Sequence, residues 1–264
     1  MIYNVDDSNV LDSSSSSKGN QDKWHIDNKW IKQDDLGYEA LAEVLSSIVL
    51  SRIDSCSFVR YDFCDIRRRE VVYSNCCVSD DCTGGDTLVT LQRLFEELDF
   101  SASNLDKLSV ADAIKLISNL IFENYNLDIK DYLGRIIYFD SIVLNEDRHL
   151  HNIHLLNCGN KLTTAPLFDN GASLLSDLAD YPLITSNLIN IRRVKSKPFT
   201  SSFNKQVSGV KKLGIAPLKI DIDNLLKDIE EFSTDRYSID IQNRCKEVLR
   251  YRLRELEGKA WLRI

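Results

Sequence analysis

The sequence predicts an α+β fold of two lobes, with a strand-rich first third and a helical remainder. Between residues 58 and 89, clusters of β-branched and aromatic residues alternate with polar turns, which is typical of strands. After Thr87, three helical runs with few helix-breaking residues follow one another. At 264 residues the chain is long enough to bury a real core. We therefore expect one lobe over residues 1–86, a second over residues 87–264, and a cleft between them.

The first lobe is predicted to contain a hairpin and a helix. Residues 1–20 are polar and end in a serine tract, so we expect a mobile lead-in or a flexible loop there. Two short apolar segments, 24–26 and 29–32, flank an Asp27-Asn28 turn signal, which predicts a β-hairpin. From residue 38 to 53, apolar residues recur at helical spacing and predict an amphipathic helix.

The second lobe is predicted to be mostly helical. The helical runs cover residues 88–98, 109–125 and 128–144, and the third is apolar on nearly all sides, so we expect it to be buried. A second hairpin is predicted around residues 157–160. The tail over 222–262 is predicted to be helical, with one apolar stripe formed by Val248, Leu249, Leu253 and Leu256.

Composition excludes several classes of protein. A chain with 43% hydrophobic and 28% charged residues is typical of a soluble globular protein. The N-terminus lacks the basic and apolar regions of a secretory signal, and no apolar run approaches the roughly 20 residues of a membrane span. The seven cysteines are odd in number and include an adjacent pair, which favours a reducing compartment. We expect a cytoplasmic protein without membrane contact, and export by a signal-less route stays open.

The charge of the chain is unevenly distributed. A net charge of −7 argues against general nucleic-acid binding, and no direct DNA binding is expected. Residues 181–220, however, contain no Asp or Glu. The cations of this basic segment are Arg192, Arg193, Lys195, Lys197, Lys205, Lys211, Lys212 and Lys219. This segment either receives an acidic or RNA-associated protein substrate or is only a solvated face.

The most specific pattern lies between residues 144 and 171. Phosphoryl transfer requires a carboxylate at the attacking hydroxyl and oxygen ligands that hold magnesium on the phosphates. Asp147, followed five residues later by Asn152, supplies one carboxylate and one metal oxygen on a single loop. The predicted hairpin then brings back Asp169, a second carboxylate. Oxygen ligands of this kind suit Mg²⁺. Taken singly, each of these residues is more often a turn former or a helix cap.

These motifs resemble those of a known family of kinases. Asp147-Arg148-His149, Asn152 and the Phe168-Asp169-Asn170-Gly171 stretch are similar to the catalytic and metal-binding loops of HipA-like serine/threonine protein kinases, and more distantly of phosphatidylinositol kinases. The resemblance covers most of residues 29–175 and is weak beyond about 220. It implies a bilobal kinase fold that transfers the γ-phosphate of ATP to a protein hydroxyl. The sequence departs from eukaryotic kinases at Asn170, where they usually carry Phe.

The resemblance also implies roles for individual residues. Asp147 would be the catalytic base, and Asn152 and Asp169 would bind magnesium. Lys32 would contact the ATP phosphates. Glu39 and Glu43 lie four residues apart on the following helix, and the resemblance places Glu43 in register to pair with Lys32. The same resemblance suggests a toxin–antitoxin context, in which an antitoxin or other regulatory protein binds the kinase.

Further contacts with ATP are expected from the first lobe. The serine tract with Lys18 and Gly19 occupies the place of the phosphate-covering loop, because small residues let backbone N–H groups approach phosphates. A disordered serine tract is the alternative. Self-phosphorylation within residues 13–17 would block ATP binding. The adenine contact is expected near residues 76–79, with Cys77 and Ser79, in the linker between the lobes; a redox role or simple burial are the competing interpretations of Cys77.

Three alternatives remain open from the sequence. The cluster of His149, His151 and His154 could suggest zinc, although a strand would separate these residues and no cysteine lies at ligand spacing. A lipid or small-molecule kinase on the same scaffold is favoured by the Asp-Arg-His triplet. A non-catalytic, pseudokinase-like binding module is the third alternative, and the intact motif residues argue against it.

Overall fold

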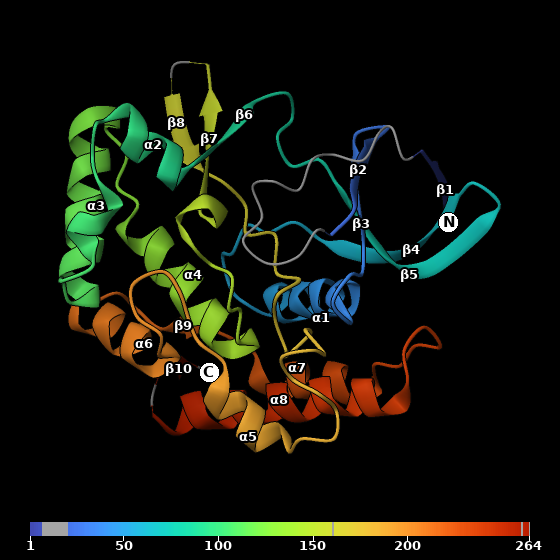
Figure 1. The fold of residues 1–264 in the computed structure, drawn as a ribbon. Helices are drawn as coiled ribbons and strands as arrows, with labels where there is room; N and C mark the ends of the chain where they lie inside the picture. The colour runs from blue at the N-terminus through green and yellow to red at the C-terminus, as the bar shows by residue number, and fades with distance from the viewer. Residues whose placement is uncertain (7–20, 160, 260, 264) are drawn as a thin grey trace.

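The computed structural model describes residues 1–6, 21–159, 161–259 and 261–263 (Figure 1). A five-stranded sheet with helix α1 beside it lies next to a larger helical part that carries a small three-stranded sheet (Figure 1). The α+β, two-part architecture predicted from the sequence is therefore confirmed. Among the described helices, none combines the length and the apolar composition that crossing a lipid bilayer requires.

The five-stranded sheet is formed by the first third of the chain. Its strands are β1 (Ile2–Val5), β2 (Lys23–Ile26), β3 (Lys29–Gln33), β4 (Tyr61–Arg68) and β5 (Val71–Asp80). Their order is β1-β4-β5-β3-β2, and only the pair of β1 and β4 is parallel. The predicted first hairpin is the pair of β2 and β3, whose turn residues Asp27 and Asn28 both have positive φ angles, as a tight two-residue turn requires.

The expectation of a mobile lead-in is wrong for the first residues of the chain. Ile2–Val5 forms strand β1, which adds to the edge of the sheet beside β4. Val5 is buried there in a cluster with Trp24, Ile31 and Ile66. Backbone pairing with a strand some sixty residues away, together with this burial, orders a segment whose own composition is polar. Residues 7–20, which include Lys18 and Gly19, lie outside the described residues.

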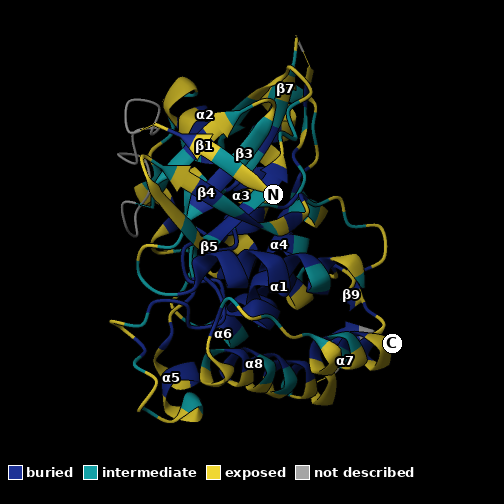
Figure 2. Ribbon diagram, turned by 90° about the vertical axis from the view of Figure 1, so that its right-hand side faces the viewer, coloured by how far each residue is buried: buried dark blue, intermediate teal, exposed yellow. Residues whose placement is uncertain are grey.

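The remaining chain forms the helical part. Its helices are α2 (Leu91–Glu97), α3 (Val110–Tyr125), α4 (Lys130–Val143), α5 (Asn187–Arg193), α6 (Phe203–Lys212), α7 (Ile222–Glu231) and α8 (Ile239–Gly258), with short 3₁₀ turns at Ala102–Leu105 and Leu150–Asn152. Helix α4 packs against α3, α6 and α8, which confirms the expectation that it is buried. Helices α1 (Glu39–Ser51) and α4 are buried along most of their length, whereas α7 and α8 expose one face (Figure 2).

The start of the first helix in the helical part differs from the predicted one. Residues 88–90 are not helical, because β6 (Thr87–Thr90) pairs with β7 (His154–Cys158), which in turn pairs with β8 (Lys161–Thr164). The hydroxyl of Thr90 then accepts a hydrogen bond from the N–H of Arg93 and caps α2, so the helix begins three residues later than its apolar pattern suggests.

The predicted helical tail is interrupted. Helix α7 ends at Glu231, and β10 (Leu262–Arg263) pairs with β9 (Leu218–Lys219). The predicted apolar stripe on α8 is confirmed, since Val248, Leu249, Leu253 and Leu256 have no exposed surface. The connection between α7 and α8 carries Arg236 and Tyr237, which contact Asp65 and Asp34 in the first third of the chain.

The α7–α8 connection joins the helical part to the five-stranded sheet. The guanidinium of Arg236 donates to Asp65 at 2.7 Å and to the carbonyl of Cys64 at 2.9 Å. The hydroxyl of Tyr237 donates to Oδ2 of Asp34 at 2.7 Å, just beyond β3. Phe232 packs beside α1 and β5. These contacts hold the sheet and the helical part together on the side of the C-terminal helices.

We expect Asp34 to make the stability of the protein depend on pH. Burial raises the pKa of Asp34 from 3.8 to about 7, although Ala40 and Tyr237 both donate hydrogen bonds to its carboxylate. The folded state thus holds a proton that the unfolded state has already released, so stability falls as pH rises toward 7 and levels off above it. Between pH 5 and 8, the free energy of unfolding of the wild type should fall by on the order of 1–3 kcal/mol more than that of Asp34→Asn. Urea titrations at several pH values measure this difference, and parallel pH dependence of the two proteins would contradict the role of Asp34.

Candidate active site

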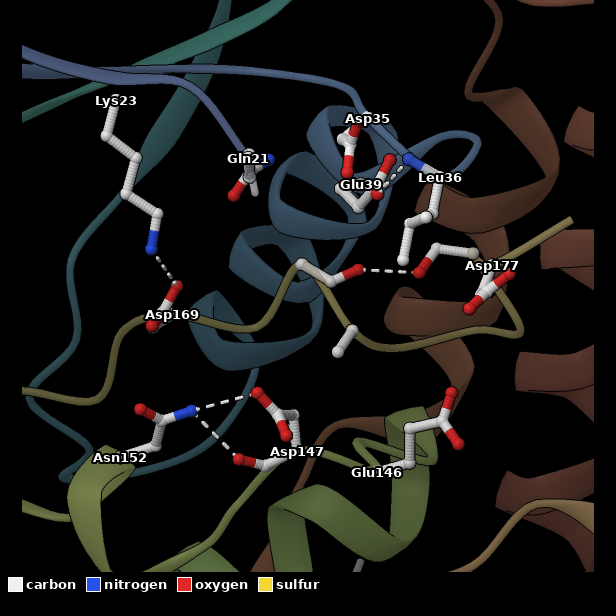
Figure 3. Close-up of a pocket in the computed structure, with 13 residues that line it drawn as sticks. Gln21, Lys23, Asp35, Leu36, Glu39, Glu146, Asp147, Asn152, Asp169 and Asp177 are labelled. Atoms are coloured by element: carbon white, nitrogen blue, oxygen red, sulfur yellow. Dashed lines mark hydrogen bonds and ion pairs between the residues drawn. The ribbon is translucent and has the colours of Figure 1, made fainter. Parts of the chain in front are cut away.

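One pocket, between the first sheet and the helical part, gathers the predicted catalytic and metal-binding residues (Figure 3). Its lining comes from β2, from the start of α1, and from the loops that follow α4 and β8. The lining residues are Gln21, Lys23, Asp35, Leu36, Glu39, Glu146, Asp147, Asn152, Asp169, Gly171, Ala172, Ser176 and Asp177. The predicted catalytic and metal-binding residues Asp147, Asn152 and Asp169 therefore face one cavity, although 22 residues separate Asp147 from Asp169.

The loop after α4 brings Asp147 and Asn152 together. Helix α4 ends where Leu144 adopts a left-handed conformation, with a φ angle of 58°. The side chain of Asn145 then accepts a hydrogen bond from the N–H of Asp147 at 3.1 Å. The amide nitrogen of Asn152 donates to the carbonyl of Asp147 at 2.8 Å and to its Oδ2 at 3.2 Å. The five-residue spacing seen in the sequence is thus a closed loop with both side chains directed into the pocket (Figure 3).

Arg148 connects this loop to the one that carries Asp169. Its guanidinium is 2% exposed and forms an ion pair with Asp140 of α4 at 3.1 Å. It also donates to the carbonyls of Asn152 and Phe168, each at 3.1 Å, and to Oδ1 of Asn170 at 2.7 Å. Burial raises the pKa of the Asp140 carboxyl group. The charge of Arg148 and its hydrogen bonds lower this pKa, but burial has the larger effect. Sequence reasoning missed this role, because the contacts of Arg148 reach across three separate segments.

Lys32 and Glu43 form the predicted ion pair. Nζ of Lys32 lies 2.5 Å from Oε1 of Glu43 and 2.7 Å from Oδ1 of Asp169. Oε2 of Glu43 accepts a hydrogen bond from the N–H of Asn170 at 2.9 Å. Glu39, the other candidate, instead accepts from the N–H groups of Leu36 and Gly37. Lys32 is 4% exposed and Glu43 is fully buried, so this pair fixes α1 against β3 and against the Asp169 loop.

The electrostatics of the pocket favour an ionised Asp169. Burial raises the pKa of this carboxyl group, but Lys23 and Lys32 outweigh that effect and hold it well below its usual range. Burial likewise lowers the pKa of Lys32, while Asp169 and Glu43 raise it well above its ordinary value. Both pKa shifts favour a charged lysine beside an ionised carboxylate at this end of the pocket.

Lys23 is a site residue that sequence reasoning missed. Its Nζ lies 3.7 Å from Oδ1 of Asp169. Lys23 belongs to strand β2 and pairs directly with Lys32 of β3. The sequence contained the signal, because a two-residue turn at Asp27-Asn28 fixes the register of the hairpin. That register places Lys23 and Lys32 opposite each other on one face.

The linker expected at residues 76–79 is misplaced. Cys77 and Ser79 lie inside strand β5, which continues to Asp80 and has β3 on one side and β4 on the other. Cys77 has no exposed surface, and burial raises the pKa of its thiol well above the ordinary value. A redox role is therefore disfavoured, since the thiolate is the reactive form. The segment that leaves the sheet is residues 81–86, and an adenine contact by Cys77 or Ser79 stays a prediction.

The three clustered histidines have different surroundings. The rings of His149 and His151 meet edge to face with their centroids 5.5 Å apart, while His154 stacks on Phe168 at 4.7 Å. Burial lowers the pKa of His149 and lowers that of His154 to about 4. Within the described part of the chain, no three His, Cys, Asp or Glu side chains are grouped so that they could hold a metal ion.

The donor set of the pocket fits magnesium. Because the amide nitrogen of Asn152 points to Asp147, its oxygen points away from that residue and remains available as a ligand (Figure 3). The carboxylate of Asp169 lies on the same pocket wall. Magnesium prefers oxygen ligands, keeps several waters and uses phosphate oxygens, so it needs only one or two protein groups. Asn152 and Asp169 meet that requirement.

Comparison with solved structures identifies the fold. Family models find no match in this sequence, and no curated protein matches it by sequence. The Helicobacter pylori proinflammatory kinase CtkA aligns over 97% of this chain and 97% of its own, with a TM-score of 0.61 at 14% identity. HipA of the Shewanella oneidensis MR-1 toxin–antitoxin system aligns over 94% of this chain and 66% of its own, with a TM-score of 0.52 at 11% identity. The chain has a HipA-like kinase fold.

Within this HipA-like kinase fold, the pocket lies where the two parts of the chain meet. The first sheet contributes Lys23, the start of α1 contributes Glu39, and the helical part contributes Asp147 and Asn152. The Asp169 loop contacts both parts, through Lys32 and Glu43 on one side and through Arg148 on the other. A group bound in this pocket would contact side chains from both parts at once.

Proposed function

We propose that this protein is an ATP- and Mg²⁺-dependent kinase of the HipA-like family that phosphorylates serine or threonine hydroxyls of a protein. The observation that carries the proposal is that Asp147, Asn152 and Asp169 line one pocket, and that Lys32, paired with the buried Glu43, contacts Asp169. The similarity of the fold to the kinase CtkA supports it. A carboxylate at the acceptor, oxygen ligands for the metal and a lysine at the phosphates are the parts that phosphoryl transfer requires.

The chemical step can be assigned to groups of this chain. Asp147 accepts the proton of the attacking hydroxyl, while the hydroxyl oxygen forms a bond to the γ-phosphorus. The bond from that phosphorus to the β,γ-bridging oxygen breaks, and ADP leaves with the electron pair. Lys32 and Lys23 orient the phosphates. Magnesium, held by Asn152 and Asp169 when bound, would neutralise the charge that develops on the phosphate oxygens.

The proposal includes the organisation of the chain. Residues 1–86 form the ATP lobe and 87–264 the catalytic lobe, which agrees with the pairing of β6 with β7 rather than with the first sheet. We place the protein in a reducing compartment such as the cytoplasm, in which its seven cysteines would stay free. The basic segment 181–220 would receive an acidic or RNA-associated substrate. Self-phosphorylation and control by an antitoxin or other regulatory protein complete the proposal.

Incubation with radiolabelled ATP tests this function. With Mg²⁺ present, the protein should transfer label to serine or threonine of a general protein acceptor or of its own chain, and excess EDTA should abolish the transfer. The same reaction with phosphoinositide-containing vesicles tests the lipid-kinase alternative. Label in lipid and not in protein would contradict the proposed substrate class. Absence of Mg²⁺-dependent ATP consumption would contradict the kinase itself and favour a non-catalytic binding module.

A further inference from the structure

A lysine of the basic segment contacts the proposed catalytic base. Nζ of Lys197 donates to Oδ1 of Asp147 at 3.0 Å, although 50 residues separate the two in the chain. The other carboxylate oxygen of Asp147 accepts from Asn152. The side chain of Lys197 is 39% exposed and that of Asp147 only 9%, so a partly exposed lysine contacts a buried carboxylate that lines the pocket.

Buried contacts hold the backbone on both sides of Lys197. The hydroxyl of Ser196 donates to the carbonyl of Thr200 at 2.6 Å, and the amide of Gln206 donates to the carbonyl of Lys197 at 2.5 Å. Ser196 is 5% exposed and Gln206, on α6, is 2% exposed. The place of Lys197 is therefore set by the packing of this segment on α6, whereas its long side chain keeps freedom to move at its end.

The distribution of charge in the pocket indicates a role for this lysine. The lining is rich in carboxylates, and Lys23 and Lys32 both lie at Asp169. During transfer, negative charge on the phosphoryl group moves away from the nucleotide and toward the hydroxyl held at Asp147. Preorganised cations at the point where charge develops contribute strongly to catalysis. Lys197 is a cation that already lies at the acceptor end.

We propose that Lys197 binds the phosphoryl group during its transfer and stabilises its charge beside Asp147. This inference rests on the proposed kinase function and assigns a catalytic residue from outside its two loops. Lys197 forms no covalent bond and keeps its proton, since the proton of the acceptor goes to Asp147. When nucleotide binds, Nζ shifts from Oδ1 of Asp147 to a phosphate oxygen beside it.

Substitution of Lys197 separates this role from a structural one. Lys197→Met and Lys197→Gln remove the charge, Lys197→Arg keeps it, and Lys107→Met removes an exposed lysine outside both the basic segment and the pocket. Steady-state consumption of Mg·ATP gives kcat and KM, and calorimetry with the non-hydrolysable β,γ-imido analogue of ATP gives affinity. Both uncharged variants should lower kcat by about 10²-fold. The KM for ATP and the affinity for the analogue should stay within about threefold, because the contact strengthens in the transition state.

The controls make each outcome decisive. Lys107→Met should match the wild type, and Lys197→Arg should recover at least about a tenth of kcat. An unchanged or increased kcat in folded Lys197→Met or Lys197→Gln would overturn the inference. An increase would show that Lys197 only binds Asp147 and hinders it as a base. An equal loss of kcat in Lys197→Arg and in the uncharged variants would also overturn it. A wild type without Mg²⁺-dependent ATP consumption would instead overturn the proposed function on which the inference rests.

Discussion

Replacing Asp147 with asparagine is expected to lower kcat for phosphoryl transfer by about 10³-fold and to leave the fold intact. Asparagine has the same shape, and its side-chain oxygen can still accept the hydrogen bond that Asn152 donates to Asp147. It cannot accept the proton of the attacking hydroxyl. The pair with Lys197 is lost as well, but Lys197 is partly exposed, so the stability should change by no more than about 1 kcal/mol.

Transfer of label from ATP measures the effect, with thermal unfolding as the test of folding. Asp106→Asn is the matched control, because Asp106 is exposed and lies outside the pocket. It should behave as the wild type does. An Asp147→Asn protein with undiminished transfer would show that Asp147 is not the base, whatever its position in the pocket.

The parts of the site that sequence reasoning could predict are those fixed by local geometry. Asp147 and Asn152 lie on one tight loop, so their spacing alone brings them together. Lys32 meets Glu43 because a hairpin strand leads directly into an amphipathic helix. Asp169 follows from the second hairpin. Each of these contacts depends on a turn, a helix or a register that can be recognised in the order of the residues.

The parts that could not be predicted depend on tertiary packing. Strand β1 pairs with β4 across some sixty residues, and nothing in its four residues specifies that partner. Lys197 reaches Asp147 only because residues 196–201 pack on α6. For residues 88–90, the apolar pattern favoured a helix, but pairing with β7 made them a strand. Strand pairing also explains why the linker predicted at Cys77 is misplaced. Strand β5 pairs with β3 and β4 and continues to Asp80.

Replacing Arg148 with methionine is expected to destabilise the protein by about 3–5 kcal/mol, because it leaves the carboxylate of Asp140 buried without a cation. Asp140 is 3% exposed, and burial already raises its pKa. The substitution also removes the hydrogen bonds to the carbonyls of Asn152 and Phe168. Activity should fall even in the folded fraction, because the loops of Asn152 and Asp169 lose their common anchor. Urea unfolding and labelled-ATP transfer measure the two effects.

A double variant separates charge from anchoring. Adding Asp140→Asn to Arg148→Met removes the unpaired buried charge, so much of the lost stability should return. Activity should not return, since the double variant still lacks the hydrogen bonds of Arg148 to the carbonyls of Asn152 and Phe168. Arg252→Met is the matched control, because Arg252 is 3% exposed but binds Ser141 and Glu255 away from the pocket. That variant should lose stability and keep kcat. If the double variant regained full activity, Arg148 would serve only to neutralise Asp140, and the convergence of Asn152 and Asp169 would need another cause.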